Sequence, residues 1–139
     1  MFESCRAHLA MPDYTIVNLM EIENRATEGG PTVEARFARG AIESEHIGVS
    51  HIRYVPGGRS TQGHTHREQE EVYVVLGGSG QVKLDDTLHD VRRWDLVRVA
   101  PGVFRGFAAG PEGLELLAIG SDRPEGGDGL HAGDDWWGD

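Results

Sequence analysis

Short strand-like runs separated by turn residues recur along most of this chain. They lie at 33–37, 47–55, 72–76, 80–84, 96–100 and 114–120, with Gly, Pro or Asp at the corners between them. Pro fixes φ and Gly permits positive φ, so both residues end strands and form turns. Strands roughly 8 to 12 residues apart without intervening helices predict an all-β sandwich or barrel of antiparallel strands.

The corner residues make this prediction more specific. Pro56-Gly57-Gly58 is expected to turn the chain after the 47–55 run, and Asp85-Asp86-Thr87 to form a hairpin tip. Strand ends are expected at 100–102 and 109–111, where Pro and Gly are adjacent. Residues 14–25 mix helix and strand periods, which indicates a short strand or a single helical turn.

A length of 139 residues supports one domain. A chain of this size buries roughly 68% of its unfolded surface and is too short for two ordinary cores. We expect an N-terminal extension and lead-in segment at 1–32, a β-barrel at 33–120 and an acidic tail containing Gly and Trp at 121–139. Residues 1–10 are an extended terminus if Met11, rather than Met1, is the natural start.

The tail contains two adjacent tryptophans, Trp136 and Trp137. Aromatic rings are costly to leave in water, so these two are expected to cap the barrel or a partner subunit.

Charge and cysteine content restrict the partners and the compartment. The net charge of −10 repels phosphate backbones and anionic lipid surfaces, which predicts no nucleic-acid and no membrane partner. Cys5 is the single cysteine, so an intrachain disulfide and a thiolate zinc site are excluded, as suits a reducing cytoplasm. The first ten residues lack the apolar core of a signal peptide, and no later run reaches the roughly 18 apolar residues of a membrane span. We therefore expect a cytoplasmic protein.

The stretch GHTHREQEEVYVVLGGSG (63–80) contains the residues with the clearest chemistry. His64 and His66 are two residues apart, so in a strand both side chains project to one face. If residues 67–70 turn the chain, Glu71 enters the next antiparallel strand beside the histidine pair. Imidazole nitrogen and carboxylate oxygen are ligands shared by Fe(II), Mn(II), Zn(II), Ni(II) and Cu(II). The spacing thus indicates a metal site.

Alternatives to this ligand set remain. A His-x-His pair alone is more common on a solvated strand than at a metal, and the added carboxylate favours the site. Glu68 and Glu70 are other candidate carboxylates, but they lie in the predicted turn. Tyr73 shares the strand face of Glu71, which predicts a phenol near the ion. His51 completes the site if its strand face is inward, although a histidine that merely fills a strand position is the more common case.

The other potential catalytic side chains give weaker evidence of a catalytic role. His8, His46, His89 and His131 lie in predicted termini or turns and are expected to be solvated. Nucleophilic catalysis is poorly supported, because the single cysteine lies near the N-terminus and no serine stands in a Gly-x-Ser-x-Gly elbow.

The metal-site residues lie in a pattern that resembles the first motif of the cupins. That motif runs Gly, five residues, His-x-His, three or four residues, Glu, six residues, Gly, and its places are filled here by Gly58, His64, His66, Glu71 and Gly78. The second cupin motif is matched in part. Trp94-Asp95 stands where Gly-Asp is usual, Ala100-Pro101-Gly102 where Pro-Pro-Gly is common, Arg105 where the fourth ligand histidine belongs, and Ala109 where Asn does.

The resemblance, which covers about residues 33–120, implies a small jelly-roll β-barrel, also called a double-stranded β-helix. It implies a homodimer, as in many single-domain cupins, and a divalent transition metal such as Fe, Mn, Zn or Ni. We expect a small-molecule ligand in a pocket inside the barrel, lined by His64, His66, Glu71, Tyr73, Arg105 and Phe107. Cupins include dioxygenases, isomerases, decarboxylases, sugar binders and sensor domains, so no single reaction follows. A metal-free RmlC-like epimerase fits less well, because the first motif is filled.

Arg105 cannot replace histidine as a ligand, because a guanidinium has no free lone pair. One interpretation is an open two-histidine, one-carboxylate site in an oxygenase or isomerase of a small carboxylate, with Arg105 binding the anionic substrate. Another is a non-catalytic module that binds or senses an acid. In the third, Arg105 forms an ion pair with Glu71 and the metal site is vestigial.

Overall fold

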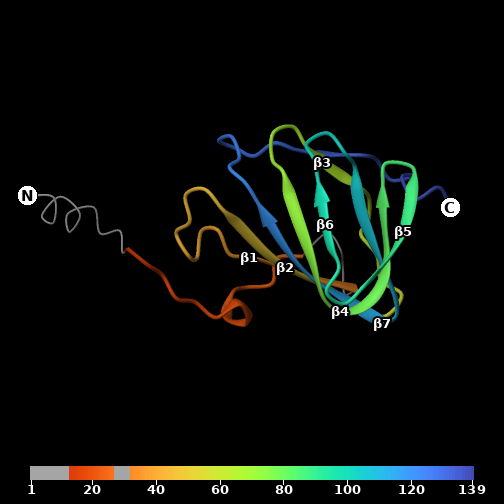
Figure 1. Cartoon of the computed structure of the whole chain (residues 1–139), viewed down its shortest axis with the longest axis horizontal. Coiled ribbons are helices and arrows are strands. Elements are labelled where there is room, and N and C mark those ends of the chain that lie inside the picture. Colours follow the sequence, from red (N-terminus) through yellow and green to blue (C-terminus); the bar gives the residue numbers. More distant parts are fainter. Residues whose placement is uncertain (1–12, 27–31) are drawn as a thin grey trace, which may run out of the picture.

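The structure, a computed structural model, describes residues 13–26 and 32–139 (Figure 1). Met1, Cys5, His8 and Met11 lie outside the described residues. No helix in the described ranges is long and apolar enough to cross a membrane.

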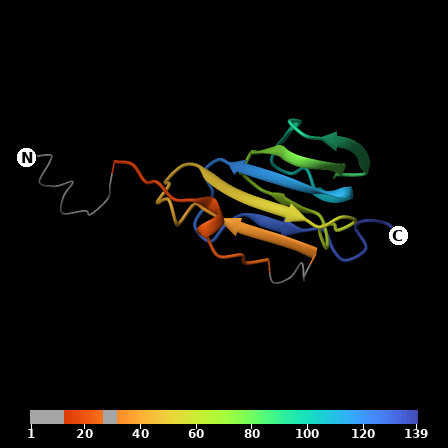
Figure 2. The ribbon, with the colours of Figure 1, turned by 90° about the horizontal axis from the view of Figure 1, so that it is seen from below.

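The described chain is nearly all β, and its strands form one sheet that curls into a jelly-roll (Figures 1 and 2). Every strand pairing is antiparallel. The elements are the 3₁₀ helix η1 (Leu19–Glu21) and the strands β1 (Val33–Phe37), β2 (Gly48–Tyr54), β3 (His64–His66), β4 (Glu71–Leu84), β5 (Thr87–Arg92), β6 (Leu96–Val99), β7 (Arg105–Gly120) and β8 (Gly129–His131).

The two long strands, β4 and β7, belong to both arms of the curled sheet. The first half of β4 lies between β6 and the second half of β7, which also pairs with β2. The second half of β4 lies between β5 and the first half of β7, which meets β3. The two arms therefore face each other without any break in these two strands.

Glycines allow this bend. The β4–β7 register shifts between Val75 and Gly77 and again between Gly78 and Gly80. Gly78 has φ of +73°, and a Cβ there would lie 2.0 Å from the carbonyl oxygen of Gly113. Only glycine allows both this backbone conformation and this approach.

This continuity corrects two expectations. The runs at 72–76 and 80–84 are one strand, β4, and residues 109–111 do not end a strand but lie inside β7. The glycines that suggested breaks form bulges, at which the chain bends while its pairing continues. The predicted all-β jelly-roll is confirmed, as is the hairpin tip at 85–86 between β4 and β5.

The core fills the space between the two arms. It consists of buried side chains that project inward from the strands: Tyr54, Tyr73, Val75, Val82, Val91, Val99, Phe107, Leu114, Leu116 and Ala118. Burial of these apolar surfaces is the main force that closes the sheet.

The sequence predicts a short strand or a single helical turn at 14–25, and the structure has the helical turn, η1. Asn18 caps η1, because its Oδ1 accepts a hydrogen bond from the backbone N–H of Met20 at 2.9 Å. Further on, Asn24 Oδ1 accepts from the backbone N–H of Ala35 at 2.9 Å, which holds this segment against β1.

The C-terminal tail packs on the barrel, as its tryptophans predicted. A Cβ at Gly63 would lie 2.5 Å from Trp136 Cε2, so the ring rests directly on the backbone there. The Lys83 ammonium lies 4.6 Å from the centre of the same ring. Trp137 Nε1 donates to the carbonyl of Ser60 at 2.8 Å. The tail is thus part of the folded unit.

Removing this contact should destabilise the protein. We expect Trp136→Ala, or deletion of residues 134–139, to lower the melting temperature by about 5 °C or more, because a largely buried aromatic ring contributes roughly 1.5–3 kcal/mol. Differential scanning calorimetry measures this. Trp94→Ala, which removes a ring that is 65% exposed, is the control and should have a much smaller effect. Equal shifts in the two variants would contradict the capping role.

Candidate metal centre

Two neighbouring elements bring the predicted ligands together. β3 is only three residues long and carries His64 and His66 on one face, with buried Thr65 on the other. A turn at 67–70 then leads into β4, whose first residue is Glu71. The strand parity and the turn that the sequence predicted are therefore both present.

The three donor groups converge on one point. One ligand atom from each of His64, His66 and Glu71 lies within 4.8 Å of the other two. His66 Nε2 is 3.3 Å and His64 Nε2 is 3.9 Å from Glu71 Oε1. Donors that each lie about 2.0–2.2 Å from one ion are roughly 3–4 Å apart, so the arrangement fits a single transition-metal ion.

The convergent groups lie at the wall of a cavity of about 510 Å³. All three line it, and so do Tyr73 and Tyr54 from the core. This volume is in the range of pockets that hold a small molecule. An ion held by three protein groups would keep coordination positions open toward this space.

Neither alternative carboxylate takes part. Glu68 is exposed, and Glu70 pairs with Arg98 at 2.9 Å on the outside of the molecule. His51 does not complete the site either, because its Nε2 lies 2.7 Å from Glu115 Oε2 and it is not among the described residues that line the cavity. His46 and His89 are exposed, as predicted.

Arg105 does not lie where a residue that lines the pocket would lie. Its side chain is fully buried and is not among the described residues that line the cavity. Its Nη1 donates to the carbonyl oxygens of Val103 at 3.0 Å and His64 at 3.3 Å, while Nη2 lies 3.4 Å from Glu71 Oε1. Of the three interpretations, this geometry matches the ion pair with Glu71.

The ion pair leaves room for a metal, however. The Nη2 contact lacks hydrogen-bond geometry, so the Glu71 carboxylate is not committed to the guanidinium. Tyr73, which donates to Glu71 Oε1 at 2.7 Å, holds the same oxygen from the core side. The Tyr73 ring packs on Phe107 with centroids 4.8 Å apart, so Phe107 supports the site from the core and does not line the cavity.

The electrostatics favour the metal-binding protonation states at Glu71 and His64. At His66, by contrast, the hydrogen bonds to Glu71 and Asp128 outweigh burial and raise the pKa of the imidazole. Burial alone would raise the pKa of Glu71, but hydrogen bonds from His64, His66 and Tyr73 hold it well below its ordinary value. Burial lowers the pKa of His64, which keeps its imidazole neutral near pH 7. Burial also raises the pKa of Tyr73 well above its ordinary value, so the phenol stays protonated. An ionised carboxylate and a neutral imidazole are the forms that bind metals.

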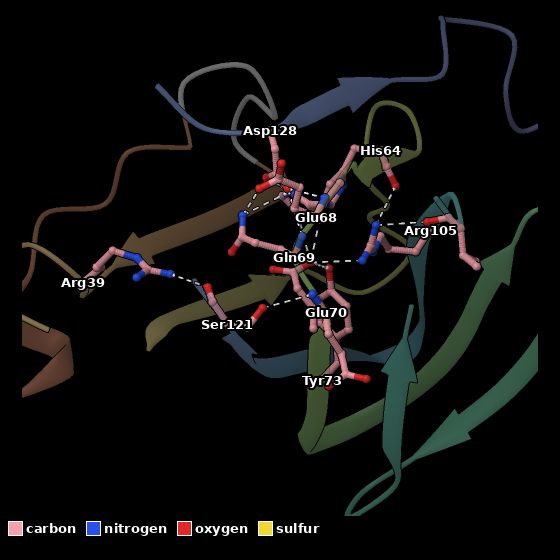
Figure 3. A network of polar contacts seen from close by, with 12 residues as sticks. Arg39, His64, Glu68, Gln69, Glu70, Tyr73, Arg105, Ser121 and Asp128 are labelled. Carbon is pink, nitrogen blue, oxygen red and sulfur yellow. Dashed lines mark hydrogen bonds and ion pairs between the residues drawn. The ribbon is translucent and has the colours of Figure 1, made fainter. Parts of the chain in front are cut away.

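Asp128 is a further residue of the site that the sequence did not reveal. Its Oδ1 lies 2.9 Å from His66 Nδ1, and its Oδ2 accepts from the backbone N–H groups of Glu68 and Gln69 at 2.8 and 2.9 Å (Figure 3). It therefore fixes both the turn and the ring of His66, leaving Nε2 directed at Glu71. Carboxylates behind metal-bound histidines play this role widely. Asp128 is one of six acidic residues in the tail, and no spacing distinguishes it.

His131 also differs from its expected role. It is exposed, as predicted, yet β8 pairs it with His64 and it lines the cavity. The sequence contained no signal for β8, because three residues between glycine-rich segments have no readable period.

Comparison with known proteins supports the fold and the family. The model of the cupin domain family matches residues 50–120, which include the candidate ligands. No curated protein matches the chain.

Solved structures share the fold. KdgF from a Halomonas species superposes with a TM-score of 0.65 at 14% identity, over 84% of this chain and 98% of that one. Streptomyces PAC13, as a variant with uridine, gives 0.70 at 19% identity, over 88% and 92%. A variant of Bacillus subtilis oxalate decarboxylase gives 0.71 at 23% identity, covering 88% of this chain but 33% of the longer enzyme.

Asp128 provides a test of the geometry around His66. We expect Asp128→Asn to weaken metal binding by about 10- to 100-fold, because the amide has no charge and its single oxygen cannot accept from both His66 and the two backbone N–H groups. Competition with a chelator measures the affinity. Asp134→Asn, an exposed change in the same tail, is the control. An unchanged affinity in Asp128→Asn would show that His66 needs no such support.

Proposed function

The chain belongs to the cupin family, and from this premise we propose that it is a metal-dependent enzyme, an oxygenase or isomerase, for a small carboxylate bound in the barrel cavity. The observation that carries the proposal is the meeting of two imidazoles and one carboxylate within 4.8 Å at the wall of that cavity. One relative of this fold is named for the small acid oxalate and another was solved with uridine, which fits a cavity for small polar molecules.

His64, His66 and Glu71 would hold a divalent transition metal such as Fe, Mn, Zn or Ni. The chemistry that such an ion supplies is polarisation of a substrate oxygen or activation of dioxygen. The protein's own groups position and shield the reactants. Tyr73 keeps its proton and orients Glu71, Asp128 orients His66, and the apolar walls limit the water that reaches the substrate.

A second candidate function is a non-catalytic module that binds or senses a small molecule. The specific observation in its favour is that Glu71 Oε1 already faces Tyr73, His66 and Arg105 at 2.7, 3.3 and 3.4 Å. These groups neutralise the buried carboxylate without a cation. In this case the role of Arg105 is to replace the metal charge, and the ligand set is vestigial.

Metal content separates the two functions. We expect about one transition-metal ion per chain in untagged protein, and loss of the metal in His64→Ala and Glu71→Ala, because each removes one of three donors. Elemental analysis measures this, with His89→Ala and Glu68→Ala as exposed controls. Iron together with oxygen uptake on small acids supports the oxygenase. Wild-type protein without metal after reconstitution would contradict the enzyme and leave the binding module.

We also propose that the protein is a cytoplasmic homodimer. Its lead-in segment exposes apolar side chains that a monomer leaves in water, with Tyr14 77%, Ile16 88% and Met20 47% exposed. Large apolar side chains exposed this close together in the chain favour an interaction surface.

Light scattering tests this assembly. We expect a mass of twice 15.2 kDa for the wild type and dissociation in Ile16→Glu, because a charge cannot be buried unpaired at an interface. A monomeric wild type at micromolar concentration would contradict the proposal.

A further inference from the structure

The cavity wall also contains positively charged side chains, on a different strand position from the candidate ligands. Arg39 and Arg123 both line it, whereas Glu71 is the single carboxylate among the described lining residues. The chain as a whole carries a net charge of −10. A cavity with low-dielectric walls focuses the field of the charges inside it, so these side chains attract anions although the protein is acidic.

Arg39 is held in place over the sheet. Its Nη2 donates to the carbonyl oxygen of Ser121 at 2.9 Å, and Figure 3 shows the pair on the side of the polar network opposite Arg105. The guanidinium lies on Gly48, where a Cβ would come within 2.6 Å of Nη2. A guanidinium has five N–H donors, and the bond to Ser121 uses one of them.

The sheet register gives the backbone distance between the two groups. Glu71 pairs with Gly120 across β4 and β7, and Gly120 pairs with Gly48 across β7 and β2. Two strand spacings, about 10 Å, therefore separate Glu71 from the strand position under Arg39. This is a backbone distance, and the Glu71 side chain reaches from its strand toward Gly120, where a Cβ would lie 3.6 Å from Glu71 Oε2. A small linear acid with an acidic group at each end can bridge a gap of this order.

We propose that the cavity selects a small dianionic acid, with one acidic group at the cation site and the other on the guanidinium of Arg39. Arg123, which is exposed at the cavity wall, adds positive charge to the same cavity. Carboxylates bind a guanidinium through two parallel hydrogen bonds, so a charged group is preferred there over a neutral one. The first anchor rests on the function proposed above, and the second stands on the arginines alone.

Paired acids of equal length test the second anchor. Isothermal titration calorimetry on the metal-loaded full chain would compare succinate, glutarate and adipate with butyrate, valerate and hexanoate. We expect at least one diacid to bind about 10- to 100-fold more tightly than its monoacid, because a charge-assisted hydrogen bond is worth that much. Arg39→Gln should reduce this ratio to about threefold or less, whereas Arg39→Lys, which keeps the charge, should retain part of it.

Controls separate this inference from the metal site. Arg92→Gln makes the same charge change on the exposed end of β5 and should keep the preference. Metal content should be equal in all variants. The inference is overturned if no diacid is preferred, or if the preference survives in Arg39→Gln. If the wild type binds no metal, the proposed function fails, and the diacid and monoacid are then compared on the metal-free protein. A diacid preference that depends on Arg39 still supports binding at the arginines. A preference that does not depend on Arg39 overturns it.

Discussion

The carboxylate of Glu71 is the constraint on which the rest of the site depends. It lies in the interior, where an unpaired charge is costly, so the surrounding groups must compensate it. Tyr73, His64, His66 and Arg105 approach the same oxygen, Oε1, within 2.7–3.9 Å. This concentration of donors around one acceptor keeps the carboxylate ionised, and an ionised carboxylate can attract a cation from the cavity.

The fold assembles these donors from distant parts of the chain. Glu71 opens β4, Arg105 opens β7, and β3 pairs with β7 so that His64 stands opposite Arg105. The bends of β4 and β7 at their glycines bring the two arms of the sheet face to face, which closes the cavity around the site. Asp128, in the tail, then fixes His66, so a residue far along the chain supports a ligand of the motif.

The sequence predicted what depends on local periodicity. The jelly-roll class, the shared face of His64 and His66 and the position of Glu71 follow from strand parity and one turn. The chemistry of a guanidinium excludes Arg105 as a metal ligand from the sequence alone. Its burial behind Glu71 could not be predicted, because it depends on packing across β3 and β7. The continuity of β4 could not be predicted, because glycine occurs both at bulges and at strand ends. Asp128 could not be predicted either, because it contacts His66 across 62 residues and no sequence motif links the two positions.

X-ray absorption spectroscopy at the edge of the bound metal tests the central claim most directly, because it reports the atoms around the ion itself. The account predicts a first shell that contains two imidazole nitrogens and at least one carboxylate oxygen at about 2.0–2.2 Å. A first shell without imidazole, or with only one, would contradict it.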